Sequence, residues 1–163
     1  MTRPNLVRAS SSTSSRSRRR VLRRATFAEL DTATLYAILQ LRVDVFVVEQ
    51  QCAYRELDGH DMEPTTQHLW IDDDGQIRAY LRLLVPTGGP ARIGRVVSAA
   101  SWRNRGAGQR LIRAALDVVR GPVVLDAQAH LQRWYERLGF VVCGAGYVED
   151  GIAHVPMALD TMR

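Results

Sequence analysis

The amino-acid sequence predicts an α/β domain of the α+β type, with a mixed, mainly antiparallel sheet and helices on both faces. Two observations predict it. The runs "HLWI" and "QIRAYLRLLV" flank the tight turn "DDDG", and a third strand, "RIGRVV", follows the loop "PTGGPA"; three antiparallel strands therefore come in succession. Beyond them, helical and strand patterns alternate. With 163 residues, 46% of them hydrophobic, the chain suits one domain with its own core.

The chain opens with a segment rich in serine and arginine. Residues 1–24 contain eight arginines and no acidic residue, so we expect a disordered arm there and a single domain over residues 25–163. The remaining 14 arginines face 17 carboxylates, so the net charge of +5 divides into +8 for the arm and −3 for the body. A transit peptide, a nucleic-acid-binding arm and an extended start of the chain all fit this composition.

The elements of the body can be placed in order. Asp31 or Thr32 caps a first helix, whose apolar residues recur at helical spacing. After the three strands we predict a helix from about Gly106 to Val119, the buried strand "VVLDA", and a short helix in "HLQRWYERLGF" that ends at Gly139. Two further strands lie around residues 141–142 and 154–159. No internal repeat is present.

Composition excludes several classes of protein. Cys52 and Cys143 are two cysteines without a secretory signal, which favours a reducing cytoplasm and no disulfide. Four scattered histidines do not form a metal-ligand set, so we expect no metal. The apolar runs fall short of the roughly 20 residues that span a bilayer. The chain also lacks the phosphate-binding motifs of P-loop NTPases and dinucleotide-dependent dehydrogenases.

The stretch "RIGRVVSAASWRNRGAGQRLIRAAL" places two glycines among arginines where a helix begins. A helix N-terminus has unpaired backbone N–H groups and a partial positive charge, and glycine lets a ligand approach the backbone closely. The arginines at positions 103, 105 and 110 add positive charge. The turn is therefore a candidate pyrophosphate site, although two glycines at a helix start also suit an ordinary tight turn.

Strand, R-x-x-G-x-G, helix, strand and the "WYERLGF" helix together resemble the GNAT N-acetyltransferase superfamily. The segments "LRVDVFVVEQ", "ELDGHDMEPTTQHLW", "IGRVV", "LDAQAHLQRWYERLGF" and "EDGIAHVPM" resemble its ElaA-type branch. The resemblance covers about residues 27–159. It implies a GNAT-like sheet that splays between its fourth and fifth strands, and acetyl-CoA as the acyl donor.

The resemblance also implies where acetyl-CoA binds. Its pyrophosphate would contact the backbone of the glycine turn and the first helical turn, which comprise Arg103, Asn104, Arg105, Gly106, Ala107, Gly108, Gln109 and Arg110. Its pantetheine arm would pair like an extra strand with Val96, Val97 and Ser98, where the sheet splays.

Tyr135 is the candidate general acid, because GNAT enzymes keep a tyrosine near the sulfur in this motif and a phenol can protonate a departing thiolate. The alternative is a packing role, which Trp134 also suits. The glutamate that many GNAT enzymes carry on the fourth strand is absent from "RIGRVVS". The candidates for the base are Glu49, Asp58, His68 and Glu149, or a water held by one of them; each could instead serve a cap, a turn or a strand hydrogen bond.

The leading hypothesis is an acetyl-CoA-dependent N-acetyltransferase acting on an amine. The alternatives are a catalytically weak acyl-CoA-binding protein and a nucleic-acid-associated protein that uses the basic arm. We expect no membrane partner, and a homo-oligomer is compatible with the sequence.

Two arginines on neighbouring strands are expected to face each other. If Val85 faces Arg92, antiparallel pairing sets Arg82 opposite Arg95. Such like charges need a neutralising anion, and we favour Glu49, Asp58 or Asp61 over an acidic group of the acceptor.

Overall fold

The computed structural model describes residues 20–161, which form an eight-stranded sheet in the order β1-β2-β3-β4-β5-β8-β6, with β7 paired to β8. Neighbouring strands are antiparallel except for β4 and β5, so the sheet is mixed and mainly antiparallel, as predicted. The strands are β1 (Arg20–Ala25), β2 (Gln67–Asp73), β3 (Gln76–Leu84), β4 (Ala91–Ser98), β5 (Pro122–Gln128), β6 (Val141–Val142), β7 (Tyr147–Glu149) and β8 (Ile152–Asp160).

Three α-helices pack on this sheet. Asp31 caps the first of them by accepting a hydrogen bond from the Thr34 N–H at 2.8 Å, which confirms the predicted start. The helices are α1 (Thr32–Arg42), α2 (Ala107–Leu116) and α3 (Gln132–Glu136). The π-helical segment η2 (Val43–Glu49) extends α1, and four short 3₁₀ segments are η1 (Phe27–Glu29), η3 (His60–Met62), η4 (Ala100–Trp102) and η5 (Ala129–Leu131).

Alternating side chains of the strands divide the core into two layers. Leu69 and Ile71 of β2 belong to the larger layer, which also contains apolar residues of α2 and α3. Trp70, between them, belongs to a second layer with Ile38 of α1 and Tyr80 of β3. Because successive strand residues point to opposite faces, α1 covers one face while α2 and α3 cover the other. The prediction of helices on both faces is therefore confirmed.

The first strand corrects the predicted boundary of the arm. Residues 20–24, assigned from the sequence to a disordered segment, form β1 with Ala25 and pair antiparallel with β2. Val21 and Leu22 are adjacent among arginines and give no alternating apolar pattern, whereas β2 supplies the hydrogen-bond partners that hold the strand. Residues 1–19 of the expected arm lie outside the described residues.

A β-bulge in β4 changes the register expected for Arg82 and Arg95. Arg82 lies opposite Gly94, whereas Tyr80 lies opposite Val97, so β4 has one extra residue between these pairs. Arg95 has a φ of 53°, a left-handed conformation typical of a bulge. The prediction that Arg82 lies directly opposite Arg95 is therefore wrong by one residue.

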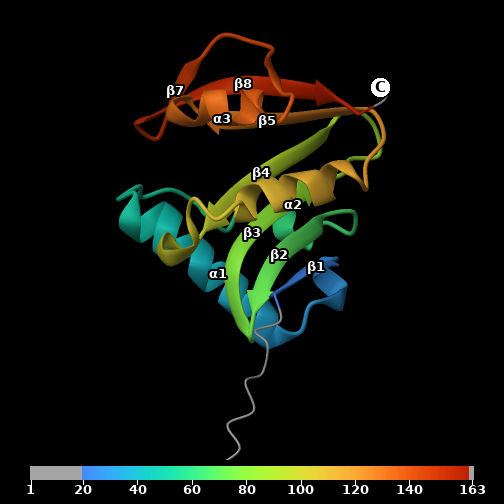
Figure 1. Cartoon of the computed structure of the whole chain (residues 1–163), viewed down its shortest axis with the longest axis vertical. Coiled ribbons are helices and arrows are strands. Elements are labelled where there is room, and N and C mark those ends of the chain that lie inside the picture. The colour runs from blue at the N-terminus through green and yellow to red at the C-terminus, as the bar shows by residue number, and fades with distance from the viewer. Residues whose placement is uncertain (1–19, 162–163) are drawn as a thin grey trace, which may run out of the picture.

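The sheet opens between β4 and β5. These strands pair only through Ala91 with Val123 and Arg92 with Val124. Figure 1 shows them meeting at one end and diverging toward the other. This divergence confirms the splay that the family resemblance implied, and it leaves one edge of β4 without a ladder partner from Ile93 onward within residues 20–161.

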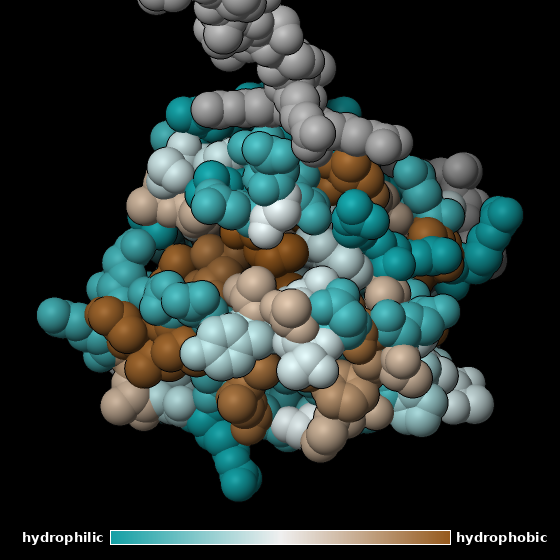
Figure 2. Space-filling model, turned by 90° about the horizontal axis from the view of Figure 1, so that it is seen from below, coloured by the Kyte–Doolittle hydropathy of each residue, from teal (hydrophilic) through white to brown (hydrophobic). Residues whose placement is uncertain are grey.

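Exposed apolar side chains are spread over several elements. The most exposed are Tyr36 of α1, Val48 of η2, Met62 of η3, Val141 of β6 and Val148 of β7. Seen from below, the surface has several hydrophobic patches separated by hydrophilic residues (Figure 2). Among residues 20–161, no helix combines the length and the apolar content needed to cross a membrane.

Candidate functional site

The glycine turn lies between η4 and α2. Asn104 and Gly106 both have positive φ angles, of 60° and 75°, and they reverse the chain before the helix begins. The N–H of Arg110 donates the first hydrogen bond of the helix, to the Gly106 carbonyl at 3.0 Å. The N–H groups of residues 107–109 precede this bond, so they form the unpaired N-terminal set that suits an anion.

The two glycines of the turn have different surroundings. A Cβ added at Gly106 would meet no atom within 4 Å, but the positive φ there disfavours any other residue. A Cβ at Gly108 would lie 3.3 Å from the Trp134 ring and 4.0 Å from Val96 Cγ1. Gly106 therefore faces open space at the candidate phosphate site, whereas Gly108 also lets α2 pack against Trp134 of α3.

Arg103, one of the candidate pyrophosphate residues, has a partner within the chain. Its Nη2 donates to Glu49 Oε2 at 2.7 Å, which joins the turn to the end of η2. This hydrogen bond lowers the pKa of Glu49 and raises that of Arg103. Both side chains are largely exposed, so a competing anion could reach the guanidinium.

The candidate pantetheine strand is the free edge of β4. Val97 is buried against α1, while Val96 packs partly buried on the opposite layer with Trp134. Ser98 pairs with Ala79 of β3 and leaves its other edge toward the splay. An extended chain can add to such an edge through backbone hydrogen bonds.

Tyr135 lies in the core layer beneath the splay and is 5% exposed. Its ring packs edge-on against Trp134 at 4.7 Å and against Phe140 at 5.9 Å between centroids. Among residues 20–161 its hydroxyl has no hydrogen-bond partner, and burial raises its pKa. The ring of Tyr135 therefore has the packing role that was the alternative to catalysis. Its neutral hydroxyl can still donate a hydrogen bond or a proton.

A buried ion network, which the sequence did not reveal, holds the segment 54–61 beside the splay. Arg42 of α1 is fully buried; its Nε donates to Glu56 Oε1 at 2.5 Å and its Nη1 to Asp61 Oδ1 at 2.7 Å. Burial opposes the charge of Arg42, but these acceptors outweigh it and raise the arginine's pKa. The only sequence signal was an arginine within the apolar stripe of the first helix.

Arg82 and Arg95 complete this network. Arg82 donates to both oxygens of Asp58, each at 2.7 Å, and Arg95 Nη2 donates to Asp58 Oδ2 at 3.1 Å. Burial would raise the pKa of Asp58, but the two arginines lower it to about 2. The expected neutralisation by an internal carboxylate is confirmed for Asp58, and Arg82 also reaches Asp61 at 3.2 Å. Arg95 also pairs with Glu56 at 2.8 Å.

The structure separates the candidate bases. His68 is fully buried, and its two ring nitrogens contact the Tyr80 hydroxyl and the Asp61 carbonyl, at 2.8 and 3.0 Å. Burial lowers its pKa. Asp58 is held by arginines, Glu49 is paired with Arg103, and Glu149 lies exposed on β7. None of the four is a free base beside the splay.

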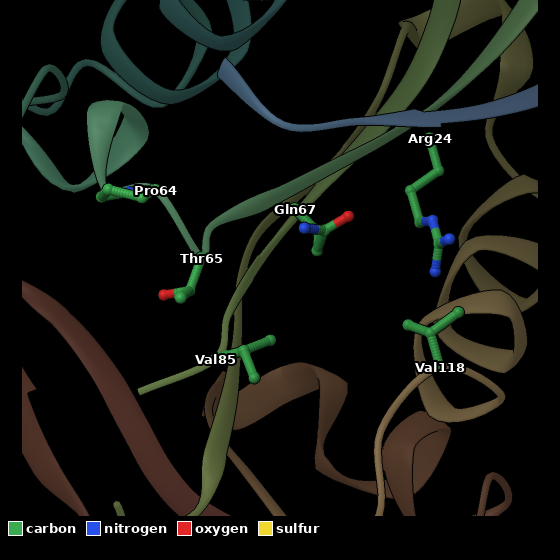
Figure 3. Close-up of a pocket in the computed structure, with 6 residues that line it drawn as sticks. All are labelled: Arg24, Pro64, Thr65, Gln67, Val85 and Val118. Atoms are coloured by element: carbon green, nitrogen blue, oxygen red, sulfur yellow. The ribbon is translucent and has the colours of Figure 1, made fainter. Parts of the chain in front are cut away.

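Two surface pockets lie away from this region. One of about 430 Å³ is lined by Arg24, Pro64, Thr65, Gln67, Val85 and Val118. Figure 3 shows Arg24 pointing toward Val118 across it, without converging polar groups. None of the candidate acetyl-CoA residues lines this cavity. Within the described part of the chain, no group of three or more histidine, cysteine, aspartate or glutamate side chains could hold a metal ion.

The family model described as "Acetyltransferase (GNAT) domain" matches residues 34–161. The chain belongs to the GNAT acetyltransferase family. Its sheet, with the parallel β4–β5 pair at the splay, is the GNAT fold.

Relatives support the ElaA-type branch of the GNAT family. Protein ElaA of Escherichia coli is 39% identical over 145 residues, covering 83% of this chain and 94% of ElaA. The crystal structure of ElaA matches with a TM-score of 0.80 and 37% identity, covering 86% of this chain and 99% of that chain. The branch predicted from the motifs is therefore confirmed.

Two further relatives agree with this assignment. An acyl-CoA N-acyltransferase from Pseudomonas aeruginosa matches in structure with a TM-score of 0.81 and 46% identity, covering 86% of this chain and 99% of that chain. A UPF0039 protein of Mycobacterium tuberculosis is 45% identical over 141 residues, covering 83% of this chain and 90% of the relative. More than four fifths of this chain thus has a counterpart in each of the two relatives.

Proposed function

We propose that this GNAT protein is an N-acyltransferase that moves an acetyl group from acetyl-CoA to an amine. The observation that carries the proposal is the unpaired edge of β4 from Ile93 to Ser98, which leads through η4 into the glycine turn. An extended pantetheine can hydrogen-bond to that edge, and the pyrophosphate then meets the N-terminus of α2. The two parts suit one ligand that has an amide chain and phosphates.

Tyr135 supplies the proton for the departing sulfur in this proposal. Burial keeps the phenol protonated, and it would also raise the pKa of a thiol in the same place. The two groups therefore shift in the same direction, and the phenol can stabilise the thiolate as it leaves. In this proposal the acceptor approaches from the opposite face of the sheet.

A second candidate is an acyl-CoA-binding protein of low catalytic power. The segment Ala91–Ser98 contains no carboxylate, so β4 offers no base of its own. Nucleic-acid binding through the basic arm stays a prediction, because residues 1–19 lie outside the described residues. Its binding would weaken steeply with salt and would be lost on removal of residues 1–19.

A two-step experiment tests the proposed function. Calorimetry first measures binding of acetyl-CoA, butyryl-CoA and free CoA to the purified protein. A panel of amines, including amino acids, polyamines, aminoglycosides and peptide N-termini, is then scored for release of free CoA thiol. Saturable thiol release that requires an amine supports the N-acetyltransferase. Tight acyl-CoA binding without transfer to any amine would favour the second candidate.

A further inference from the structure

His154 lies on β8, the strand that pairs with β5 on the side away from the splay. In the β5–β8 ladder it is paired with Gln128, the last residue of β5. The β4–β5 pairing stops at Val124, so Gln128 stands four residues into the diverging part of the sheet. β5 borders the opening, and His154 lies on β8, directly across β5 and level with its diverging end.

The loop that follows η2 contacts the strands on either side of this position. Gln50 Oε1 accepts a hydrogen bond from Gln128 Nε2 at 3.2 Å, and Cys52 Sγ lies 3.6 Å from the Asp150 carbonyl oxygen. The loop thus contacts both β5 and the β7–β8 hairpin. His154 is half-buried behind this crossing, and its ring stacks on Tyr147 with centroids 5.6 Å apart.

The tautomer of His154 follows from its one hydrogen bond. Nδ1 lies 2.9 Å from the Ile152 carbonyl oxygen, which can only accept. Nδ1 must therefore carry the hydrogen, and in the neutral ring Nε2 holds the lone pair. Within residues 20–161 Nε2 has no partner. His68 differs, because both of its ring nitrogens are engaged.

His154 and Tyr135 act from opposite faces of the sheet. Ala127 and Met157 belong to the core layer of Tyr135. Gln128 is one position from Ala127 on β5, and its partner His154 is three positions from Met157 on β8. Because side chains alternate along a strand, Gln128 and His154 point to the other face. The proposed proton donor for sulfur and an imidazole with an unpartnered Nε2 within residues 20–161 thus lie on the two faces of the sheet.

We propose that His154 is the general base of the acetyl transfer, an inference that rests on the proposed N-acetyltransferase function. The amine nitrogen forms the new C–N bond with the acetyl carbon and loses one proton to Nε2 of His154. The C–S bond breaks, its electron pair goes to sulfur, and sulfur takes the proton of the Tyr135 hydroxyl. Solvent then moves a proton from the imidazolium to the phenolate, so both residues return to their starting states.

Other groups share the face of His154 and define its electrostatic surroundings. Tyr147 and Glu149 come from β7, Asp126 from β5, and Arg92 from β4, where it pairs with Asp126. Burial and Asp126 raise the pKa of Tyr147 to about 12, so this tyrosine stays neutral in the working range. His154 is the group on this face with an unshared basic nitrogen.

The test compares three variants using the amine found in the acceptor panel. His154→Gln keeps polarity and approximate size but supplies no base, so its kcat should fall about 10²-fold or more, while the Kd for acetyl-CoA stays within about twofold of the parent. His154→Ala should regain turnover on addition of imidazole, and a series of substituted imidazoles should rescue it in order of base strength. His60→Gln, a substitution at an exposed histidine paired with Glu63, is the matched control and should keep parent activity.

The outcomes separate this inference from the proposed function. If the parent acetylates an amine and His154→Gln does so at the same rate, the assignment of His154 as the base is wrong, whereas the proposed function stands. If His154→Ala is slow and no imidazole improves its rate, the ring only packs. Loss of the fold in both His154→Ala and His154→Gln would lead to the same conclusion. If the parent binds acetyl-CoA but acetylates no amine, the proposed function fails and this inference fails with it.

Discussion

Arg103 and Glu49 form an ion pair of 2.7 Å that joins the glycine turn before α2 to the end of η2, 54 residues earlier. A guanidinium at the proposed phosphate site is thereby held by a carboxylate before any phosphate arrives. Glu49→Gln should release Arg103 and lower the Kd for acetyl-CoA by a few-fold at most, because solvent and salt screen exposed pairs. Calorimetry at low and high salt measures the change, which should shrink as salt rises.

The matched control for this variant is Glu63→Gln, which removes an exposed carboxylate paired with His60 and outside the glycine turn. It should leave the Kd within error of the parent. Equal or weaker acetyl-CoA binding by Glu49→Gln would show that Arg103 does not bind the cofactor's phosphates.

Gly106 and Gly108 should respond differently to alanine. Gly106→Ala places a side chain in open space at a φ of 75°, so it should cost about 1–2 kcal/mol of stability and weaken acetyl-CoA binding. Gly108→Ala brings a methyl group to 3.3 Å from Trp134, and its cost should fall when Trp134 is replaced by Phe. Chemical denaturation and calorimetry measure both effects. Additive costs for Gly108→Ala and Trp134→Phe would contradict the packing contact.

Local sequence signals predicted the fold well because they are short-range. The hairpin of β2 and β3, the Asp31 cap and the helix after the glycine turn each depend on a few adjacent residues. The strand β1 was missed because its stability comes from β2, which lies more than 40 residues later. Its arginine-rich composition resembled the arm that precedes it.

The site was predicted less completely, because its charges are arranged by tertiary contacts. Nothing local indicates that Arg42 is buried against Glu56 and Asp61, or that a bulge at Arg95 turns this side chain toward Asp58. His154 was an ordinary strand residue in the sequence; only the β5–β8 register and its single hydrogen bond single it out.

Breaking the buried ion network should be costly. Glu56→Gln leaves the fully buried Arg42 without one of its two carboxylates, and removing a partner from a buried pair costs about 3–5 kcal/mol. Arg23→Gln, which breaks an exposed pair with Asp72, should cost less than about 1 kcal/mol. Urea denaturation of the two variants gives the comparison. Similar midpoints in both would show that the network adds little to stability.

The buried His68 should make stability depend on pH. Burial lowers its folded pKa below the ordinary 6.5, so in the window below about 6.5 the unfolded chain binds a proton that the folded chain does not. The free energy of unfolding should therefore rise with pH across this window, by at most about 1.4 kcal/mol per pH unit from this group. Denaturation from pH 5 to 8 should show a smaller slope in His68→Gln and the parent slope in His60→Gln. An unchanged slope in His68→Gln would mean that another group causes it.

Tyr135→Phe separates the proton donor from the packing role of the same ring. Phenylalanine keeps the edge-on contacts with Trp134 and Phe140 and removes a hydroxyl that has no partner within residues 20–161, so stability should change by less than about 1 kcal/mol. In the proposed mechanism the hydroxyl donates its proton as the sulfur leaves, so kcat should fall about 10²- to 10⁴-fold with little change in the Kd for acetyl-CoA. Thiol release with the amine that the parent acetylates measures kcat, and calorimetry with acetyl-CoA measures the Kd.

The acyl donor provides a second test of the proton donor. A thiolate leaving group whose thiol is more acidic needs less protonation, so the loss of kcat should be smaller with such a thioester. Equal losses for all donors, or none, would return Tyr135 to packing alone.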